Sequence, residues 1–125
     1  MKKSRKQKKE EPLSRAEIPD EVQCDLNTVG GVKGLCERLP PPKSIVKISA
    51  THHALSDPVR MTILYLLAVQ PLCVCVIKAC IGIADSKLSY HLTVLKKAGL
   101  IFGEQQGNWI IYRLTDKGSV FIREK

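Results

Sequence analysis

The apolar residues in the second half of the chain recur at the spacing of buried helices. In "SDPVRMTILYLLAVQP", Asp57 can accept hydrogen bonds from the first free amides, and Pro58 suits the first helical position because it has no amide hydrogen to satisfy. Pro71 ends the run. Apolar residues lie almost all round this segment from Val59 to Val69, so we expect a helix that is buried on most sides.

A second clear helix is predicted over residues 85–98, in "ADSKLSYHLTVLKKAG". Leu88, Leu92 and Leu95 share one face of it. The opposite face is polar, rich in hydrogen-bonding groups and poor in acids. Two lysines near its end and Gly99 after it favour the C-terminus of a helix at this point.

The residues after this helix predict a hairpin. "LIFGEQQGNWIIYRL" holds two extended runs around the turn residues Gln106, Gly107 and Asn108, and its second run is rich in β-branched and aromatic side chains. Residues 115–125 have room for one short helix. Two short helices joined by "GIA", followed by a hairpin, describe a mainly α fold with a small β-hairpin wing, the winged helix-turn-helix.

The N-terminal third differs in composition. Residues 1–20 are charged and poor in large apolar side chains, which predicts a disordered basic tail that either solubilises the chain or binds phosphates. Residues 21–43 are an extension with two cysteines, in which a short helix late in the stretch precedes the stiff spacer "LPPPK". Residues 44–125 are the folded domain. Its first predicted helix, "SIVKISATHHAL", turns its two isoleucines and Leu55 inward.

The chain is basic, with 20 Lys and Arg against 12 Asp and Glu and a net charge of +8. The excess is not confined to the tail, because residues 44–125 carry ten Lys and Arg against five Asp and Glu. It suits a polyanionic partner, nucleic acid before membrane. No run approaches the ~18 to 20 apolar residues of a membrane span, and no apolar stretch follows the basic N-terminus as in a secretory signal. We therefore expect a soluble cytoplasmic protein that makes no membrane contact.

Three of the five cysteines lie in "PLCVCVIKAC". An odd count in a reducing compartment does not indicate a disulfide framework. By composition alone burial is the simplest interpretation, since cysteine behaves as a small hydrophobe, but metal binding and redox chemistry stay open. On an ideal helix Cys73 and Cys75 are about 200° apart, so one ion bound by both requires a distorted helix start. Cys80 lies about two turns from Cys73, and we expect it to pack.

Four segments in this order and spacing, "HALSDPVRMTILYLL", "LCVCVI", "LSYHLTVLKKAGLI" and "GNWIIYRLTD", resemble the ArsR/SmtB family of metal-responsive transcriptional repressors. The resemblance spans roughly residues 45–117. It implies a homodimer that sits on a partly palindromic operator in double-stranded DNA. It also implies that the dimer leaves the operator when an effector binds.

The resemblance places the recognition helix at residues 85–97. The side chains expected to meet base edges and phosphates are Ser86, Lys87, Ser89, Tyr90, His91 and Lys96. His91, beside the apolar Leu92, suits packing or a phosphate contact better than metal binding. The wing tip, residues 105–108, lacks the basic residues of many family members, so we expect it to add little phosphate affinity.

Cys73 and Cys75 stand where the family has its "LCVC" metal box, which implies that both are thiolate ligands of an effector ion. In the cadmium- and lead-responsive branch an N-terminal cysteine completes the site, which implies Cys24 or Cys36 here. Soft thiolates favour Cd(II), Pb(II), As(III), Hg(II) or Cu(I), and Zn(II) also accepts such sites. The C-terminal site of other members needs histidine, which "DKGSVFIREK" does not contain.

We therefore expect a DNA-binding repressor that a thiophilic ion releases, and not an enzyme. A redox switch at the same cysteines is the alternative, and it keeps the DNA-binding dimer. A Cys-x-Cys thiol oxidoreductase is a weaker alternative, because the chain lacks the Cys-x-x-Cys spacing and an obvious general base.

Overall fold

The computed structural model describes residues 17–122, and the chain divides into two compact units between Pro42 and Lys43. Residues 1–16 of the predicted disordered tail lie outside the described residues. No helix in the described range is long and apolar enough to cross a membrane.

The first unit contains two short helices, α2 (Asp20–Thr28) and α3 (Gly31–Cys36), and neither buries a residue. Gly30 and Gly31 join them with φ values of 96° and 77°, a left-handed conformation that glycine adopts at little cost. The short helix predicted late in this stretch corresponds to α3. Helix α2 was not predicted from the sequence, because only two large apolar residues, Val22 and Leu26, show helical spacing within it. Its signal is local: Pro19 precedes two acids, Asp20 and Glu21, in the first turn.

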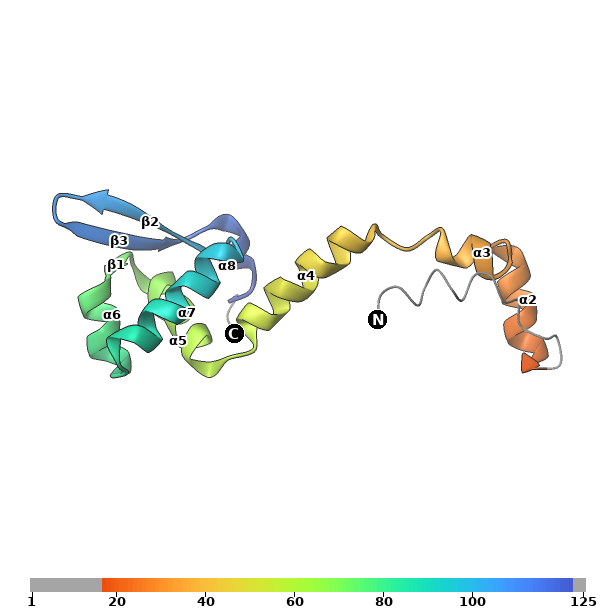
Figure 1. Ribbon diagram of the computed structural model, residues 1–125, viewed down its shortest axis with the longest axis horizontal. Helices are drawn as coiled ribbons and strands as arrows, with labels where there is room; N and C mark the ends of the chain where they lie inside the picture. The colour runs from red at the N-terminus through yellow and green to blue at the C-terminus, as the bar shows by residue number, and fades with distance from the viewer. Residues whose placement is uncertain (1–16, 123–125) are drawn as a thin grey trace. The chain divides into compact units, whose positions relative to one another are not determined.

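The second unit is a winged helix-turn-helix domain, as predicted (Figure 1). Its elements in chain order are α4 (Pro42–Leu55), α5 (Pro58–Val69), β1 (Leu72–Cys73), α6 (Val74–Ile81), α7 (Asp85–Lys97), β2 (Ile101–Gln106), β3 (Trp109–Leu114) and α8 (Asp116–Val120). The three strands form an antiparallel sheet in the order β1-β3-β2. The predicted hairpin is therefore confirmed, and the short strand β1 extends it by pairing Leu72 with Tyr112 and Cys73 with Ile111.

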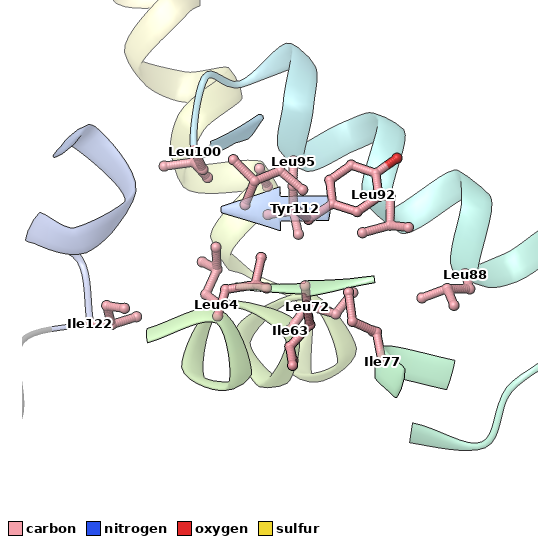
Figure 2. Close-up of a cluster of buried hydrophobic side chains, with 13 residues drawn as sticks. Ile63, Leu64, Leu72, Ile77, Leu88, Leu92, Leu95, Leu100, Tyr112 and Ile122 are labelled. Atoms are coloured by element: carbon pink, nitrogen blue, oxygen red, sulfur yellow. The ribbon is translucent and has the colours of Figure 1, made fainter. Parts of the chain in front are cut away.

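Leucine and isoleucine side chains from α5, α6, α7 and the sheet meet in one core (Figure 2). Ile63 and Leu64 of α5, Ile77 of α6 and Leu95 of α7 are fully buried. The leucine face predicted for α7 thus faces the core. Each helix contributes only a few such side chains, so the position of α7 depends on packing against α5 and β2.

Two predictions about burial are wrong. Helix α5 is buried on one side and not on most, since Val69 near its C-terminus is 79% exposed and Tyr65 is also exposed. In α4 the isoleucines Ile45 and Ile48 are exposed, and only its last turns pack against the domain, through Thr51 and Ala54. Apolar residues at helical spacing therefore form an outward face along α4, an arrangement that suits contact with another molecule.

A buried arginine joins α4 and α5 to the helix-turn-helix. Arg60 is 4% exposed, and its Nε donates to the carbonyl of Ala54 at 2.8 Å while Nη2 donates to that of His53 at 3.3 Å. Both carbonyls lie in the last turn of α4, where helical amides run out. The His53 carbonyl also accepts from the amide and hydroxyl of Ser56, so the Ala54 carbonyl depends most on Arg60. The remaining guanidinium nitrogen, Nη1, lies 3.0 Å from Nδ1 of His91 on α7. One side chain thus connects three helices.

Asp57 caps α5, as predicted. Its Oδ1 accepts from the amides of Val59 at 2.7 Å and Arg60 at 3.2 Å. Partial burial acts to raise the pKa of Asp57, but these amide hydrogen bonds and the nearby His91 and Arg60 outweigh it and hold the pKa below its usual value. The carboxylate therefore stabilises the fold above its ordinary pKa, and this contribution disappears as the pH falls through the lowered value.

We expect Asp57→Ala to lower the free energy of unfolding by about 1 kcal/mol near neutral pH, because α5 loses its cap. Urea unfolding of both proteins measures this difference. The difference shrinks as the pH falls from about 4, the ordinary carboxyl pKa, through the lowered pKa of Asp57, where the cap of the folded wild-type protein becomes protonated. Asp57→Asn is the control, since asparagine caps about as well as aspartate. An equal loss in Asp57→Asn at neutral pH contradicts the capping role.

We expect Arg60→Met to lower the free energy of unfolding by about 2 kcal/mol, because it leaves the carbonyl of the buried Ala54 without a donor and removes the link to His91. Chemical denaturation provides the measurement. Arg113→Met is the matched control, since Arg113 forms a surface ion pair with Glu104 at 2.6 Å that contributes at most about 1 kcal/mol. Equal losses in the two variants rule out the special role of Arg60.

Candidate nucleic-acid interface and thiol site

The helix-turn-helix consists of α6, a three-residue turn and α7. Gly82 ends α6 with φ 72° in the left-handed region, and Ala84 precedes the first residue of α7 in an extended conformation. Across the turn, Nζ of Lys78 lies 2.5 Å from Oδ1 of Asp85, although both side chains are substantially exposed. The turn and this ion pair fix the direction in which α7 leaves α6.

The outer face of α7 carries four of the six residues predicted to contact DNA. Ser86, Lys87, Ser89 and Tyr90 are all exposed, and Tyr90 is 57% exposed. The hydroxyl, ammonium and phenol groups that they present can donate hydrogen bonds to bases or phosphates. The bounds of α7 are those predicted for the recognition helix, residues 85–97.

The structure places His91 differently from those four residues. Its side chain is half-buried, and Nδ1 lies within hydrogen-bond distance of Arg60. Because a guanidinium only donates, the neutral imidazole of His91 accepts at Nδ1 and carries its proton on Nε2. His91 therefore anchors α7 to α5, which is one of the two roles expected for it; the other, a phosphate contact, stays a prediction.

Lys96 lies on the side of α7 that faces the wing. Its Nζ is 5.8 Å from the ring centroid of Tyr112, within the range of a cation–π contact. Together with Ser89 and Tyr112 it lines a recess of about 210 Å³ between α7 and β3. The hairpin itself carries only one basic residue, Arg113, and Glu104 pairs with that residue.

The two cysteines of the Cys-x-Cys pair meet at the start of α6. Cys73 is extended, with φ −86° and ψ 164°, and occupies the N-cap position, whereas Cys75 lies in the first turn of the helix. Their sulfur atoms are 2.9 Å apart. The predicted distortion of the helix is therefore not needed, because Cys73 belongs to β1 and precedes the helix.

The pair differs in acidity. A hydrogen bond from the Cys75 thiol, assisted by the Val76 amide, lowers the pKa of Cys73. Donating that bond raises the pKa of Cys75. Cys73 is thus the first of the two to become a thiolate, at a helix N-terminus, where negative charge is favoured. Cys73 is half-buried and Cys75 is exposed, so neither is core filler.

The other three cysteines lie elsewhere. Cys80 is exposed, so the prediction that it packs is wrong. Cys24 lies exposed on α2, and Cys36 is the half-buried last residue of α3, both within the first unit. Within residues 17–122 no three His, Cys, Asp or Glu side chains come together as a group able to hold a metal ion.

The Cys73–Cys75 pair nevertheless fits one thiophilic ion. Two thiolates that bind one tetrahedral ion at about 2.3 Å lie about 3.8 Å apart, so the two sulfur atoms, 2.9 Å apart here, need to separate by about 1 Å to hold it. Sulfur donors select soft ions. A resident ion would be held by Cys73 and Cys75, and its charge would lie at the N-terminus of α6.

Sequence reasoning missed two residues near these sites. Arg60 was treated as part of an apolar helix, although a charged residue inside such a run signals a buried hydrogen-bonding role. Trp109 was assigned to a strand only. The structure shows it 58% exposed, beside the thiol pair in a recess that Cys73 and Cys75 also line.

Comparison with known proteins agrees with this architecture. The profile of the family described as "Bacterial regulatory protein, arsR family" matches residues 57–101. The solution structure of a homodimeric winged helix-turn-helix DNA-binding domain from Mycobacterium bovis, Mb0332, superposes with a TM-score of 0.60 at 24% identity. The match covers 67% of this chain and 81% of that one, and it confirms the predicted fold.

Three relatives are similar in sequence. The transcriptional repressor SmtB of Mycobacterium tuberculosis is 35% identical over 78 residues, which are 62% of this chain and 58% of that protein. The arsenical resistance operon repressor of Bacillus subtilis is 42% identical over 65 residues, 51% of this chain and 62% of the relative. The chain thus spans about three fifths of the length of these two proteins.

The third relative is matched over more of its length. The HTH-type transcriptional regulator MJ1325 of Methanocaldococcus jannaschii is 37% identical over 71 residues, 56% of this chain and 80% of that protein. All three are transcription regulators by name, which supports the prediction that the chain is not an enzyme. Profile, relatives and fold agree that the chain belongs to the ArsR/SmtB family of transcriptional regulators.

Proposed function

We propose that this protein is a homodimeric transcriptional repressor whose α7 reads operator DNA and which a thiophilic ion at Cys73 and Cys75 releases. The observation that carries the proposal is the approach of the two sulfur atoms to 2.9 Å at the N-terminus of α6. Helix α6 is the first helix of the helix-turn-helix, so a ligand at this point acts on the element that positions α7.

DNA binding is supported by charge and exposure together. The outer face of α7 presents Lys87 with three hydrogen-bonding neighbours, and its single acid, Asp85, is paired with Lys78. The domain from residue 44 onward has a net charge of +5, from ten basic and five acidic residues. Such a face suits the major groove, where side-chain donors meet base edges and phosphates.

Dimerisation is supported by an exposed apolar surface on α4 and α8. Val46 and Ile48 of α4 are exposed, and so are Val120 and Phe121 at the end of α8. The two elements adjoin, since the ring of Phe121 lies 6.2 Å from that of His52. A second copy that buries this surface produces two recognition helices related by a twofold axis, which matches a palindromic operator.

Release follows from differential binding. If the ion binds more tightly to a conformation in which α6 and α7 no longer fit the operator, it lowers DNA affinity, and DNA lowers ion affinity by the same factor. Where the ion requires a third sulfur ligand besides Cys73 and Cys75, we propose that Cys24 or Cys36 supplies it. The effector is a soft ion such as Cd(II), Pb(II), As(III) or Cu(I), or else Zn(II).

A redox switch is the second candidate, and the same distance favours it. Two sulfurs at 2.9 Å, one of them with a lowered pKa, are close to the about 2.04 Å of a disulfide bond. An external thiol oxidant would be reduced as Cys73 and Cys75 form that bond. This event would alter the same helix start.

We expect Lys87→Ala to weaken operator binding at every salt concentration, because one phosphate or base contact is lost. The slope of log Kobs against log salt falls by about 1 if the contact is to phosphate. Fluorescence anisotropy of labelled DNA from upstream of the gene measures both quantities. Lys33→Ala, which removes an exposed lysine of α3, is the control. If both variants bind alike, α7 is not the recognition helix.

We expect Cys73→Ser plus Cys75→Ser to bind the operator normally and to lose release by soft ions, because the two donors are gone. The measurement is DNA anisotropy of reduced protein titrated with As(III), Cd(II), Pb(II), Zn(II) and Cu(I). Cys80→Ser is the matched control, and it keeps the wild-type response.

Release that persists in the double variant contradicts the proposal. If soft ions fail to release wild-type protein from DNA and a mild oxidant succeeds, the redox switch takes its place.

A further inference from the structure

The imidazole of His91 lies between the interior of the domain and its surface. Nη1 of the buried Arg60 lies 3.0 Å from Nδ1 of His91, so the ring accepts at Nδ1 and carries its hydrogen on Nε2. The side chain is half-buried, and Nε2 has no hydrogen-bond partner within residues 17–122. Since every buried side-chain nitrogen in that range has a partner, Nε2 is open to the outside. The ring therefore presents one fixed donor outward.

This donor lies on an edge of α7 that also carries a positive charge. Lys87 precedes His91 by four residues, about one helical turn, so the two side chains share that edge, and Lys87 is exposed. The major groove is about 12 Å wide, and a helix with its side chains is about 10 to 12 Å across. A helix that fills the groove reads bases with its outer face, and its edges lie against the phosphate backbones.

We propose that Nε2–H of His91 donates to a backbone phosphate of operator DNA and that Arg60 is the positioning residue for this contact. The contact rests on the proposed reading of DNA by α7 and is independent of release by an ion. Arg60 is also bound to two carbonyls of α4, so its guanidinium cannot follow the ring if the ring turns. A flipped ring or the other tautomer of His91 loses the hydrogen bond from Arg60.

The chemistry of this donor suits a phosphate oxygen. A hydrogen bond to an anionic acceptor is stronger than one to a neutral base edge. The bond accepted at Nδ1 strengthens the donor at Nε2 further, because hydrogen bonds in a chain polarise one another. A neutral donor replaces no counterion, so its contribution depends less on salt than that of a lysine. His91 thus supplies a backbone contact that persists where salt weakens the lysine contacts.

The test is fluorescence anisotropy of labelled DNA from upstream of the gene, with reduced full-length protein. In His91→Asn the amide oxygen takes the place of Nδ1 and accepts from Arg60, but the side chain is too short to reach the backbone. We expect about tenfold weaker binding to this DNA and to unrelated DNA alike, because a hydrogen bond to an anion is lost. His91→Gln should restore most of the affinity, since its amide can accept at Oε1 and donate at Nε2.

Two readouts separate the phosphate contact from a purely structural role. The slope of log Kobs against log salt should keep its wild-type value in His91→Asn, because no charge is removed. The urea midpoint should also stay unchanged, because the hydrogen bond from Arg60 remains. His53→Asn, which replaces an exposed histidine of α4, is the matched control and should bind DNA like the wild-type protein.

The positioning role of Arg60 is tested by nitrogen NMR of histidine-labelled wild-type protein bound to DNA. The chain has three histidines, and the His91 signals are those that disappear in His91→Asn. We expect a neutral ring with its hydrogen on Nε2. In the background of Arg60→Met, His91→Asn should add little further loss of DNA affinity, because the ring is no longer held. The NMR measurement decides the role of Arg60 even if that variant does not fold.

The outcomes separate the phosphate contact from the proposed function. Equal DNA affinity of His91→Asn and wild-type protein, or a hydrogen on Nδ1 of His91 in the complex, overturns the contact and leaves the repressor intact. A loss of affinity that comes with a lower urea midpoint and is not restored by His91→Gln shows a structural role and also overturns it. Failure of the wild-type protein to bind DNA at all overturns both.

Discussion

The buried guanidinium of Arg60, on α5, connects this helix with α4 and with α7. It is 4% exposed, and its three hydrogen bonds run to the last turn of α4 and to His91 of α7. Only a planar group with several fixed donors can serve acceptors in these different directions, and a lysine ammonium cannot reproduce that fork. Lys117 adds a second connection, because its Nζ donates to Thr51 of α4 and to the carbonyl of Ala98 after α7.

Helix α7 is attached to the rest of the domain at separate points along its length. The recognition helix is held in its middle by His91 and at its end by Lys117, while its start depends on the turn after α6. The thiols lie at the opposite end of α6, a helix of eight residues. Under the proposed function, an ion at the sulfurs would act on α7 through this short helix, while His91 and Lys117 hold the middle and the end of α7.

Sequence patterns predicted those parts of the fold that follow from local chemistry. Asp57 and Pro58 marked the start of α5, and the leucine spacing with the turn "GIA" marked α7, because capping and periodicity act within a few residues. The burial of Arg60 and the exposure of Ile48 depend on which distant surfaces meet, or on a second copy of the chain. Periodicity identifies an apolar face, and it does not say whether that face meets the chain's own core.

The approach of Cys73 to Cys75 also depends on a contact between segments that are distant in the sequence. Two residues separated by one position point about 200° apart on an ideal helix. The sequence alone therefore argued against Cys73 and Cys75 binding one ion together. They converge because β1 pairs with β3 and keeps Cys73 extended, so that the helix begins one residue later. The wing thereby shapes the site as well as flanking it. The hairpin places Trp109 in the recess that the two cysteines line, whereas its uncharged tip presents no positive charge to phosphates.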